Sequence, residues 1–315
     1  MEHCPLVTIV VLTYQRFDWI KNNLESIAKQ KYRNIEVVIQ DDSSPNFDRA
    51  YLEGLCKATL GNRKWIVHQN EKNEGTVKSF NAAIFIAKGE FVFPLSQDDC
   101  FYSEDTVTKI VRFFQEHPDC MSCTSNRIGK ASKRVYPDRT DTELLNSWDR
   151  NELWPRILYE NFISGSTIYY RTGFMKKRDG FDTDFLLLED YPFVAAMVLE
   201  NYKIGFLDEI TIVYGEDGVS NSMSQNPKML ADRMVFYEKY IVPNMELILY
   251  KRMKKYIKYL YGDIRCRQNL IQRILHNVWS WKVVVPHLYE VHIKKLRTEE
   301  RYYLWKRSNK REVSR

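Results

Sequence analysis

The sequence predicts an α/β fold in which a mostly parallel, Rossmann-like sheet is covered by helices on both faces. Short runs of apolar and β-branched residues, such as 6–12 and 35–39, alternate with longer segments that have helical spacing. Apolar runs that are not interrupted by a polar residue at every second position are typical of strands that are buried on both faces of a parallel sheet. Each run also ends in polar residues, and ligands bind at the carboxyl ends of such strands.

The elements of the first half follow this alternation in order. Residues 17–30, for example, carry Ile20, Leu24 and Ile27 at helical spacing between the first two apolar runs. We expect strands at residues 6–12, 35–39, 65–67, 91–95 and 120–124, and helices over residues 17–30, 47–60, 76–87 and 104–116.

The second half is less regular. We expect a loop or hairpin at residues 130–141, helices at 148–160 and 189–201, strands at 167–170 and 203–213, and basic helices at 245–261 and 269–281. The chain therefore divides into a main α/β domain, residues 1–225, and a basic helical C-terminal extension, residues 226–315.

Charge is distributed unevenly between these two parts. The chain has a net charge of +6, yet residues 228–315 contain 21 Lys or Arg against 8 Asp or Glu, so the two parts are expected to meet different partners. No apolar run is long enough to span a membrane, and the apolar N-terminal run lacks the features of a signal peptide. With six scattered cysteines as reduced thiols, we expect a cytoplasmic protein, and peripheral association with the inner face of the cell membrane stays open.

Polar clusters at four strand ends mark the expected ligand site, at residues 13–16, 41–44, 70–75 and 96–99. The chain lacks the glycine-rich fingerprints of dinucleotide and P-loop phosphate binding. Asp98 and Asp99 offer another means of neutralising phosphate, because Mg²⁺ and Mn²⁺ prefer oxygen ligands and often bind one or two carboxylates plus substrate phosphates. The same pair would also fit a solvated turn.

Taken together and in this order, the clusters resemble the family 2 inverting glycosyltransferases of the GT-A fold, of the bacterial surface-polysaccharide type. The resemblance covers about residues 5–215 and rests on VTIVVLTYQR (7–16), IEVVIQDDSS (35–44), NEGTVKSFNAAI (73–84), GEFVFPLSQDD (89–99) and LLLEDYPF (186–193). It implies a GT-A type catalytic domain that binds a nucleotide sugar. The expected reaction moves a sugar from a UDP- or dTDP-sugar to a hydroxyl of a glycan or lipid-linked acceptor.

The resemblance also implies roles for individual residues. Asp42 would accept a hydrogen bond from the imide N–H of a uracil or thymine base. Asp99 would bind Mn²⁺ or Mg²⁺ directly, and Asp98 beside it would contact the sugar or ribose and complete the carboxylate pair of the metal site. Other residues would line the nucleotide and phosphate pocket: Thr13, Tyr14, Arg16, Asn73, Gly75 and Lys78.

Asp190 would be the catalytic base, with Glu189 beside it. Inverting transfer needs one carboxylate to take the proton from the attacking hydroxyl. A carboxylate at a helix start has its pKa lowered by the helix dipole, so burial or the Glu189 charge must raise the pKa again. Helix capping is the alternative explanation of both acids.

Two positions depart from the family pattern. Ser96 replaces the first acid of the common Asp-x-Asp-Asp motif, and the loop at 214–220 has no His to help bind metal or phosphate, with Asp217 as its candidate substitute. Both departures leave open a degenerate, non-catalytic nucleotide-sugar-binding or scaffold protein. A nucleotidyltransferase is a further alternative, although residues 13–16 do not form the glycine-rich basic loop expected of that class.

The C-terminal extension mixes basic residues with aromatic ones, including Trp279, Trp281, Tyr302, Tyr303 and Trp305. This mixture fits an anionic membrane surface, a nucleic acid backbone, or a helical subdomain with solvated basic faces and a contact in a homo-oligomer. The family resemblance favours the membrane, because bacterial relatives often act on lipid-linked acceptors, and we expect no nucleic acid partner.

Overall fold

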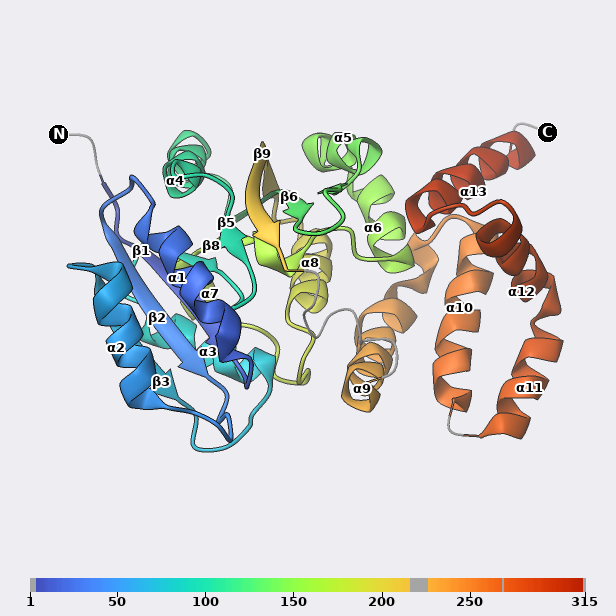
Figure 1. Ribbon diagram of the computed structural model, residues 1–315. Coiled ribbons are helices and arrows are strands. Elements are labelled where there is room, and N and C mark those ends of the chain that lie inside the picture. Colours follow the sequence, from blue (N-terminus) through green and yellow to red (C-terminus); the bar gives the residue numbers. More distant parts are fainter. Residues whose placement is uncertain (1–3, 216–225, 268, 314–315) are drawn as a thin grey trace.

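The computed structural model describes residues 4–215, 226–267 and 269–313. The β-sheet and its covering helices form one end of an elongated molecule, and the C-terminal helices form the other end (Figure 1). The predicted fold class is confirmed: a mostly parallel sheet lies between helices and is followed by a helical C-terminal region. Among the described helices, none combines the length and apolar composition that crossing a membrane requires.

The sheet has nine strands, with the order β3-β2-β1-β4-β8-β6-β9-β5 and β7 paired to β6. Strands β1 to β4 are mutually parallel, and β6 and β9 are parallel, whereas β8 and β5 run antiparallel to their neighbours. The strands span Val7–Thr13 (β1), Ile35–Asp41 (β2), Lys64–Gln69 (β3), Phe91–Pro94 (β4), Cys100–Phe101 (β5), Ser122–Gly129 (β6), Val135–Tyr136 (β7), Tyr169–Arg171 (β8) and Ile204–Tyr214 (β9).

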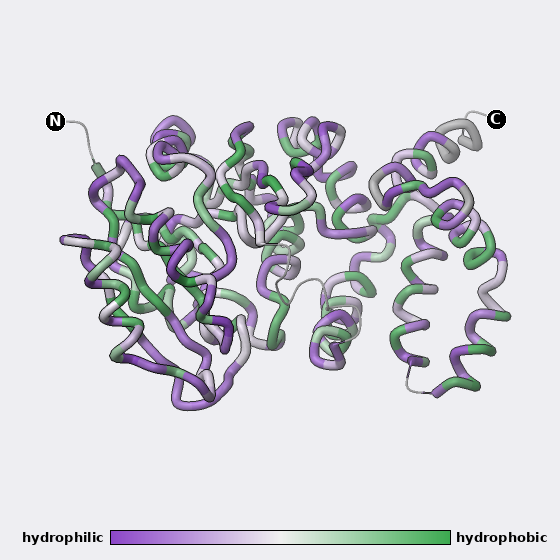
Figure 2. The backbone as a smooth tube through the Cα atoms, viewed as in Figure 1, coloured by the Kyte–Doolittle hydropathy of each residue, from purple (hydrophilic) through white to green (hydrophobic). Residues whose placement is uncertain are grey.

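Both faces of the sheet are buried, which explains the uninterrupted apolar runs. Val10 packs with α3 (Thr76–Ile86) and α8 (Asp190–Leu199), whereas its neighbours Ile9 and Val11 pack with α1 (Ile20–Ala28), α2 (Arg49–Leu60) and α4 (Thr106–Glu116) on the opposite face. The tube through β2 is accordingly hydrophobic along most of its length (Figure 2).

Strand β6 differs from the segment expected at residues 120–124, because it continues through polar residues to Gly129. These polar side chains find partners across the sheet: Ser125 Oγ lies 2.6 Å from Thr211 Oγ1, and Asn126 donates to Asp208 at 2.9 Å. A buried polar residue with a hydrogen-bond partner is compatible with a strand. The apolar pattern alone therefore ended the expected strand too early.

Three expected helices of the second half begin or end elsewhere. The helix expected at residues 148–160 is α6 (Arg150–Tyr159), and α5 (Arg139–Ser147) precedes it, with a break at the left-handed Trp148. The helix expected at residues 245–261 begins only at Lys251, as α10 (Lys251–Cys266), and the one expected at residues 269–281 is α11 (Leu270–Trp279). The remaining described α-helices are α7 (Thr172–Lys177), α9 (Pro227–Phe236), α12 (Trp281–Leu288) and α13 (Thr298–Val313). Short 3₁₀ or π-helical turns lie at Phe17–Trp19, Gly165–Thr167, Tyr237–Ile241, Val242–Leu247 and Tyr289–Ile293.

The C-terminal helices share a core with the α/β part. The Tyr159 ring of α6 lies 5.3 Å from the ring of Tyr256 in α10, and 5.6 Å and 5.4 Å from the rings of Tyr302 and Trp305 in α13. Aromatic pairs at such separations stabilise beyond their buried area. Helices α10 and α13 are therefore packed against α6 and continue its apolar core.

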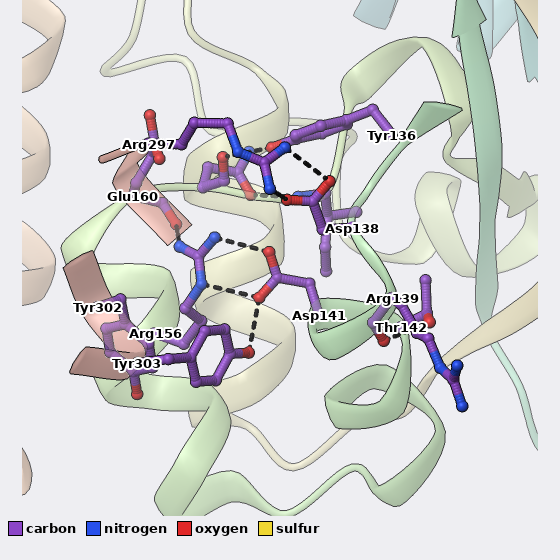
Figure 3. Close-up of polar contacts among 12 residues, drawn as sticks. Tyr136, Asp138, Arg139, Asp141, Thr142, Arg156, Glu160, Arg297, Tyr302 and Tyr303 are labelled. Atoms are coloured by element: carbon purple, nitrogen blue, oxygen red, sulfur yellow. Dashed lines mark hydrogen bonds and ion pairs between the residues drawn. The ribbon is translucent and has the colours of Figure 1, made fainter. Parts of the chain in front are cut away.

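A buried ion pair lies beneath this junction (Figure 3). Asp141 of α5 accepts two hydrogen bonds from the Arg156 guanidinium, at 2.8 and 2.9 Å, and both side chains are 1% exposed. Arg156 also donates to the carbonyl of Glu160, and Tyr303 of α13 donates its hydroxyl proton to Asp141 at 2.8 Å. The pair thereby ties the last helix of the chain to α5 and α6.

We predict that Asp141→Ala destabilises the protein by about 3–5 kcal/mol, because it leaves the Arg156 charge buried without its partner. Urea unfolding followed by circular dichroism measures the change. Glu143→Ala is the matched control, since the Glu143 side chain is 64% exposed and surface changes stay within about 0.5 kcal/mol. Equal unfolding midpoints for the two variants would contradict the structural role of this pair.

Candidate functional site

The carboxyl ends of β1 and β2 meet at one edge of the sheet. Thr13 Oγ1 donates to Asp41 Oδ2 at 3.0 Å, and Ser44 donates both its N–H, at 2.8 Å, and its hydroxyl, at 2.7 Å, to the same carboxylate. Ser44 Oγ in turn accepts from the N–H of Gln15. Asp41, which the sequence did not single out, therefore shapes the turn that presents Thr13 and its neighbours.

Asp42 is buried and holds the loop that follows β3. Its carboxylate accepts the N–H groups of Glu74 (2.7 Å) and Gly75 (2.9 Å) and the Asn70 amide (2.9 Å). The Asn73 amide donates to the Asp42 carbonyl at 3.4 Å. A carboxylate has about four acceptor positions, so three protein donors leave one position for a ligand.

Gly75 lies at the start of α3 with φ +88°, a backbone conformation that favours glycine. A Cβ at this position would lie 2.4 Å from the Leu186 carbonyl oxygen, and the N–H of Val77 donates to that same oxygen at 3.2 Å. The loop after β3 is therefore packed directly against the segment that precedes α8.

The other predicted pocket residues are more exposed and lie on the same loops. Tyr14 is 40% exposed, and the Arg16 guanidinium lies over the Trp19 ring at 4.3 Å. Lys78 extends from the first turn of α3, with its amino group 4.0 Å from Glu74. These longer side chains border the edge of the sheet where Thr13 and Asp42 are buried.

The adjacent carboxylates after β4 differ in environment. Asp98 is partly exposed, whereas Asp99 is 0% exposed, and its Oδ1 accepts the Gly215 N–H at 2.8 Å. Burial, and then the Asp98 charge, raise the pKa of Asp99 well above its ordinary value. Asn23 holds the turn by donating to the carbonyls of Ser96 and Asp99.

The donor set around Asp99 fits a divalent cation. Its Oδ2 is buried and has no hydrogen-bond partner within the described part of the chain, and a cation would supply the positive charge that an ionised buried carboxylate requires. No cluster of three or more His, Cys, Asp or Glu suited to a metal occurs among the described residues. Two carboxylates completed by substrate phosphates are sufficient for Mg²⁺. Asp217 lies outside the described residues.

Asp190 is the first residue of α8, and Glu189 is its N-cap. Asp190 accepts the N–H groups of Tyr191 (2.7 Å) and Gly165 (3.0 Å) and, at 3.4 Å, the Asn161 amide. Burial raises the pKa of Asp190, and these N–H donors act in the opposite direction. Burial and the Asp190 charge raise the pKa of Glu189 to about 8.

The two carboxylates of this pair differ in their hydrogen-bond donors. Burial is the largest cause of the raised pKa of both groups, and the Asp190 charge adds to it for Glu189. With a pKa of about 8, Glu189 holds its proton at neutral pH. The N–H groups of Tyr191 and Gly165 favour the anionic form of Asp190, which is the form that a general base needs.

Arg127 of β6 is a residue that the sequence did not indicate. Its positive charge lowers the pKa of Asp99 and of Asp190, so the guanidinium lies within electrostatic reach of both carboxylates. It stacks on the Tyr214 ring at 3.6 Å, and its Nε is buried with no hydrogen-bond partner in the described structure. Arg127 therefore brings positive charge between the two acidic centres.

Asp232 of α9 is a third residue that sequence reasoning missed. It is 4% exposed, and its carboxylate accepts the N–H groups of Leu186, Leu187 and Leu188 at 2.7–3.1 Å. This segment leads directly into Glu189. A side chain from the C-terminal extension thus positions the segment that carries the predicted base.

Comparison with known proteins identifies a family for most of the α/β part. The sequence model of the family described as Glycosyl transferase family 2 matches residues 8–183. An uncharacterized glycosyltransferase of Haemophilus influenzae is 26% identical over 61% of this chain and 60% of its own length. A putative colanic acid biosynthesis glycosyl transferase, WcaA of Escherichia coli, is 23% identical over 76% of this chain and 83% of its length.

Solved structures share the fold. Residues 1–349 of Staphylococcus aureus TarS, in complex with UDP-GlcNAc, superpose with a TM-score of 0.58 at 23% identity, over 86% of this chain and 79% of that chain. A mannosyltransferase from Pyrobaculum calidifontis, in complex with GDP-Man and Mn²⁺, gives a TM-score of 0.60 at 15% identity, over 93% of this chain and 89% of that chain.

We predict that the stability of the protein falls as the pH rises from about 4.5 to about 8. Folded Glu189 holds its proton up to about pH 8, whereas an unfolded chain releases it near 4.5. Proton binding therefore favours the folded state, and this contribution is fully present below about pH 4.5, decreases between the two pKa values and is lost above about pH 8. Thermal unfolding at a series of pH values measures the loss.

Glu189→Gln cannot release this proton, so its melting temperature should depend less on pH between about 5 and 9. Glu143→Gln, a change at a 64% exposed carboxylate, is the control and should follow the wild type. If the Glu189 variant keeps the full pH dependence, this carboxyl does not hold a proton in the folded state.

Proposed function

The chain belongs to glycosyl transferase family 2, and we propose that it transfers a sugar from a UDP- or dTDP-sugar to a hydroxyl of a glycan or lipid-linked acceptor. One observation carries this proposal: backbone N–H groups hold Asp42 and Asp99, which follow β2 and β4, and Asp190, which begins α8. In the proposed reaction these three carboxylates serve nucleotide recognition, metal binding at the phosphates and proton removal.

The nucleotide lies at the ends of β1 and β2. The acceptor position left on Asp42 takes the imide N–H of a uracil or thymine base. Tyr14 and Arg16 cover the nucleotide from the loop after β1, with Thr13 beneath them, and Lys78 faces the phosphates from α3. Asn73 and Gly75 complete the lining of the nucleotide pocket, because Asp42 already holds their loop against the sheet.

Asp99, with Asp98 beside it, would hold Mn²⁺ or Mg²⁺, and the bound cation would stabilise the negative charge that develops on the leaving nucleoside diphosphate. Asp98 is the more exposed carboxylate and faces the donor sugar or ribose. Arg127 adds a fixed positive charge near both acidic centres.

Asp190 acts as the general base. It accepts the proton of the acceptor hydroxyl as that oxygen attacks the anomeric carbon. The bond between the anomeric carbon and the diphosphate oxygen breaks with its electron pair on the oxygen, so the nucleoside diphosphate leaves. Attack from the face opposite the leaving group inverts the configuration of the anomeric carbon.

The relatives support a donor with a nucleotide and a role in surface polysaccharides. TarS binds UDP-GlcNAc, and the Pyrobaculum enzyme binds GDP-Man with Mn²⁺, which favours a nucleotide sugar and a divalent cation here. The name of WcaA, a putative colanic acid biosynthesis glycosyl transferase, favours a role in the synthesis of a surface polysaccharide. The chain spans less than two thirds of several relatives, with 60% and 22% of the lengths of two of them.

A non-catalytic protein that binds a nucleotide sugar is the second candidate. Ser96 in place of the first acid of the family motif, and the lack of a His in the sequence of residues 214–220, favour it. It would share the donor site but would not need a base. Transfer by the purified protein decides between the two.

We predict that Asp190→Asn lowers the rate of sugar transfer by ~10²-fold or more, the scale of a general base contribution. Donor binding stays near the wild-type value, because the amide cannot accept the proton but keeps the shape of the side chain. Transfer is measured with radiolabelled donor and binding by calorimetry. Asp119→Asn, at an exposed acid, is the control, and unchanged transfer by the Asp190 variant would exclude this residue as the base.

We also predict that binding of UDP or dTDP depends on Mn²⁺ or Mg²⁺ and weakens ~10-fold or more in Asp99→Asn, because a ligand of the cation is lost. Calorimetry with UDP, dTDP and GDP, with and without Mn²⁺, measures this. Asp105→Asn, at a carboxylate with 48% exposure, is the control. Binding of every nucleoside diphosphate without regard to metal would contradict the proposed metal site.

A further inference from the structure

Helix α11 (Leu270–Trp279) turns its apolar face toward solvent. Trp279 is 85% exposed and Leu270 is 72% exposed, which is unusual for large apolar side chains. The exposed apolar residues recur at the spacing of one helix face: Leu270, Ile271, Ile274, Leu275, Val278 and Trp279.

The polar face of α11 packs inward, onto α10. The His276 ring stacks on the Tyr259 ring at 5.3 Å, and its Nε2 lies 3.0 Å from the Tyr259 carbonyl oxygen. Tyr259 donates its hydroxyl proton to Asn277 at 3.2 Å, and Arg273 donates to Asp263 at 3.0 Å. Because polar contacts hold the helix in this orientation, its exposed apolar face is a feature of the fold.

Helix α12 and the turn after it continue the same kind of surface. Trp281, Val285, Leu288 and Tyr289 are 46–57% exposed and also lie on one face. The opposite side of α12 is held inward, where His287 packs on the Tyr256 ring at 5.0 Å and lies 3.0 Å from Arg301. The α11–α12 face lies at the end of the molecule farthest from β1, β2 and β3 (Figure 1).

Positive charge lies beside this apolar face. Residues 251–295 contain eleven Lys or Arg and two Asp or Glu, and four of these arginines form ion pairs: Arg252, Arg265, Arg267 and Arg273. The Lys282 amino group lies 5.6 Å from the centre of the Trp281 ring, and the Lys294 amino group lies 5.4 Å from that of Tyr289. Aromatic and aliphatic side chains beside lysines are typical of helices that lie in the interface of an anionic bilayer.

We propose that the apolar faces of α11 and α12 dock onto an anionic lipid bilayer, with the neighbouring lysines against the lipid phosphates. A lipid bilayer fits this face better than a second copy of the chain does, because a symmetric dimer would place two equally basic faces against each other. The two helices have 10 and 8 residues, so they lie along the surface and do not cross the bilayer. Docking is independent of the proposed transfer reaction.

The structure also separates the aromatic residues of the extension into two groups. Tyr302 and Trp305 are 0% and 2% exposed and pack on Tyr159, so they anchor α13 to the α/β part. Trp279 and Trp281 remain exposed on the apolar face. Together with Tyr289, this second group is available to lipid.

The test is co-sedimentation of the full chain with vesicles of phosphatidylcholine, with and without phosphatidylglycerol. We expect binding to the anionic vesicles, with release by high salt because screening weakens the lysine–phosphate attraction. The double variant Ile271→Ser, Trp279→Ser should bind ~10-fold or more weakly, because two large side chains no longer enter the apolar layer. Both positions are solvent-exposed, so melting temperature and UDP binding should stay at wild-type values.

The control variants remove exposed apolar side chains outside this face: Leu249→Ser (69% exposed) and Phe85→Ser (51% exposed). Both should bind anionic vesicles as the wild type does. The proposal fails if the wild type does not sediment with anionic vesicles, or if the double variant binds as well as the controls. It also fails if the wild type is a dimer that the double variant converts into monomers without any vesicle binding, since the occupant is then a second copy.

Discussion

Buried carboxylates at the edge of the sheet are the constraint on which the site depends. An ionised carboxylate removed from water needs donors in place of the water that it loses. Asp42 takes these donors from the start of α3, Asp190 from Gly165 and its own helix, and Asp232 from the segment before α8. Each acid therefore fixes a piece of backbone that lies far away in the sequence.

These contacts connect the two ends of the site. Asp42 holds the N–H of Gly75, Gly75 lies against Leu186, and Leu186 donates its N–H to Asp232 just before Glu189. The loop that is predicted to line the nucleotide pocket is thus connected to the predicted base through packed backbone. Such continuity keeps groups at fixed separations, as transfer between two bound substrates requires.

Much of this arrangement could be predicted from local sequence, and the rest depends on long-range contacts. The strands followed from apolar runs, because both faces of the sheet are buried, and the acids at strand ends followed from the geometry of parallel sheets. Arg127 and Asp232 carry no local signal, since their partners lie tens of residues away in the sequence. Periodicity also shows that α11 is amphipathic, but only its packing on α10 shows which face is covered.

The position of Asp232 has a consequence for how parts of such enzymes are recombined. A chain that is cut or exchanged before α9 loses the acceptor for three backbone N–H groups beside Glu189. A chimera joined after α9 keeps the segment before the base in place. Its new C-terminal helices must still cover Tyr159 and supply a partner for Asp141, as α10 and α13 do here.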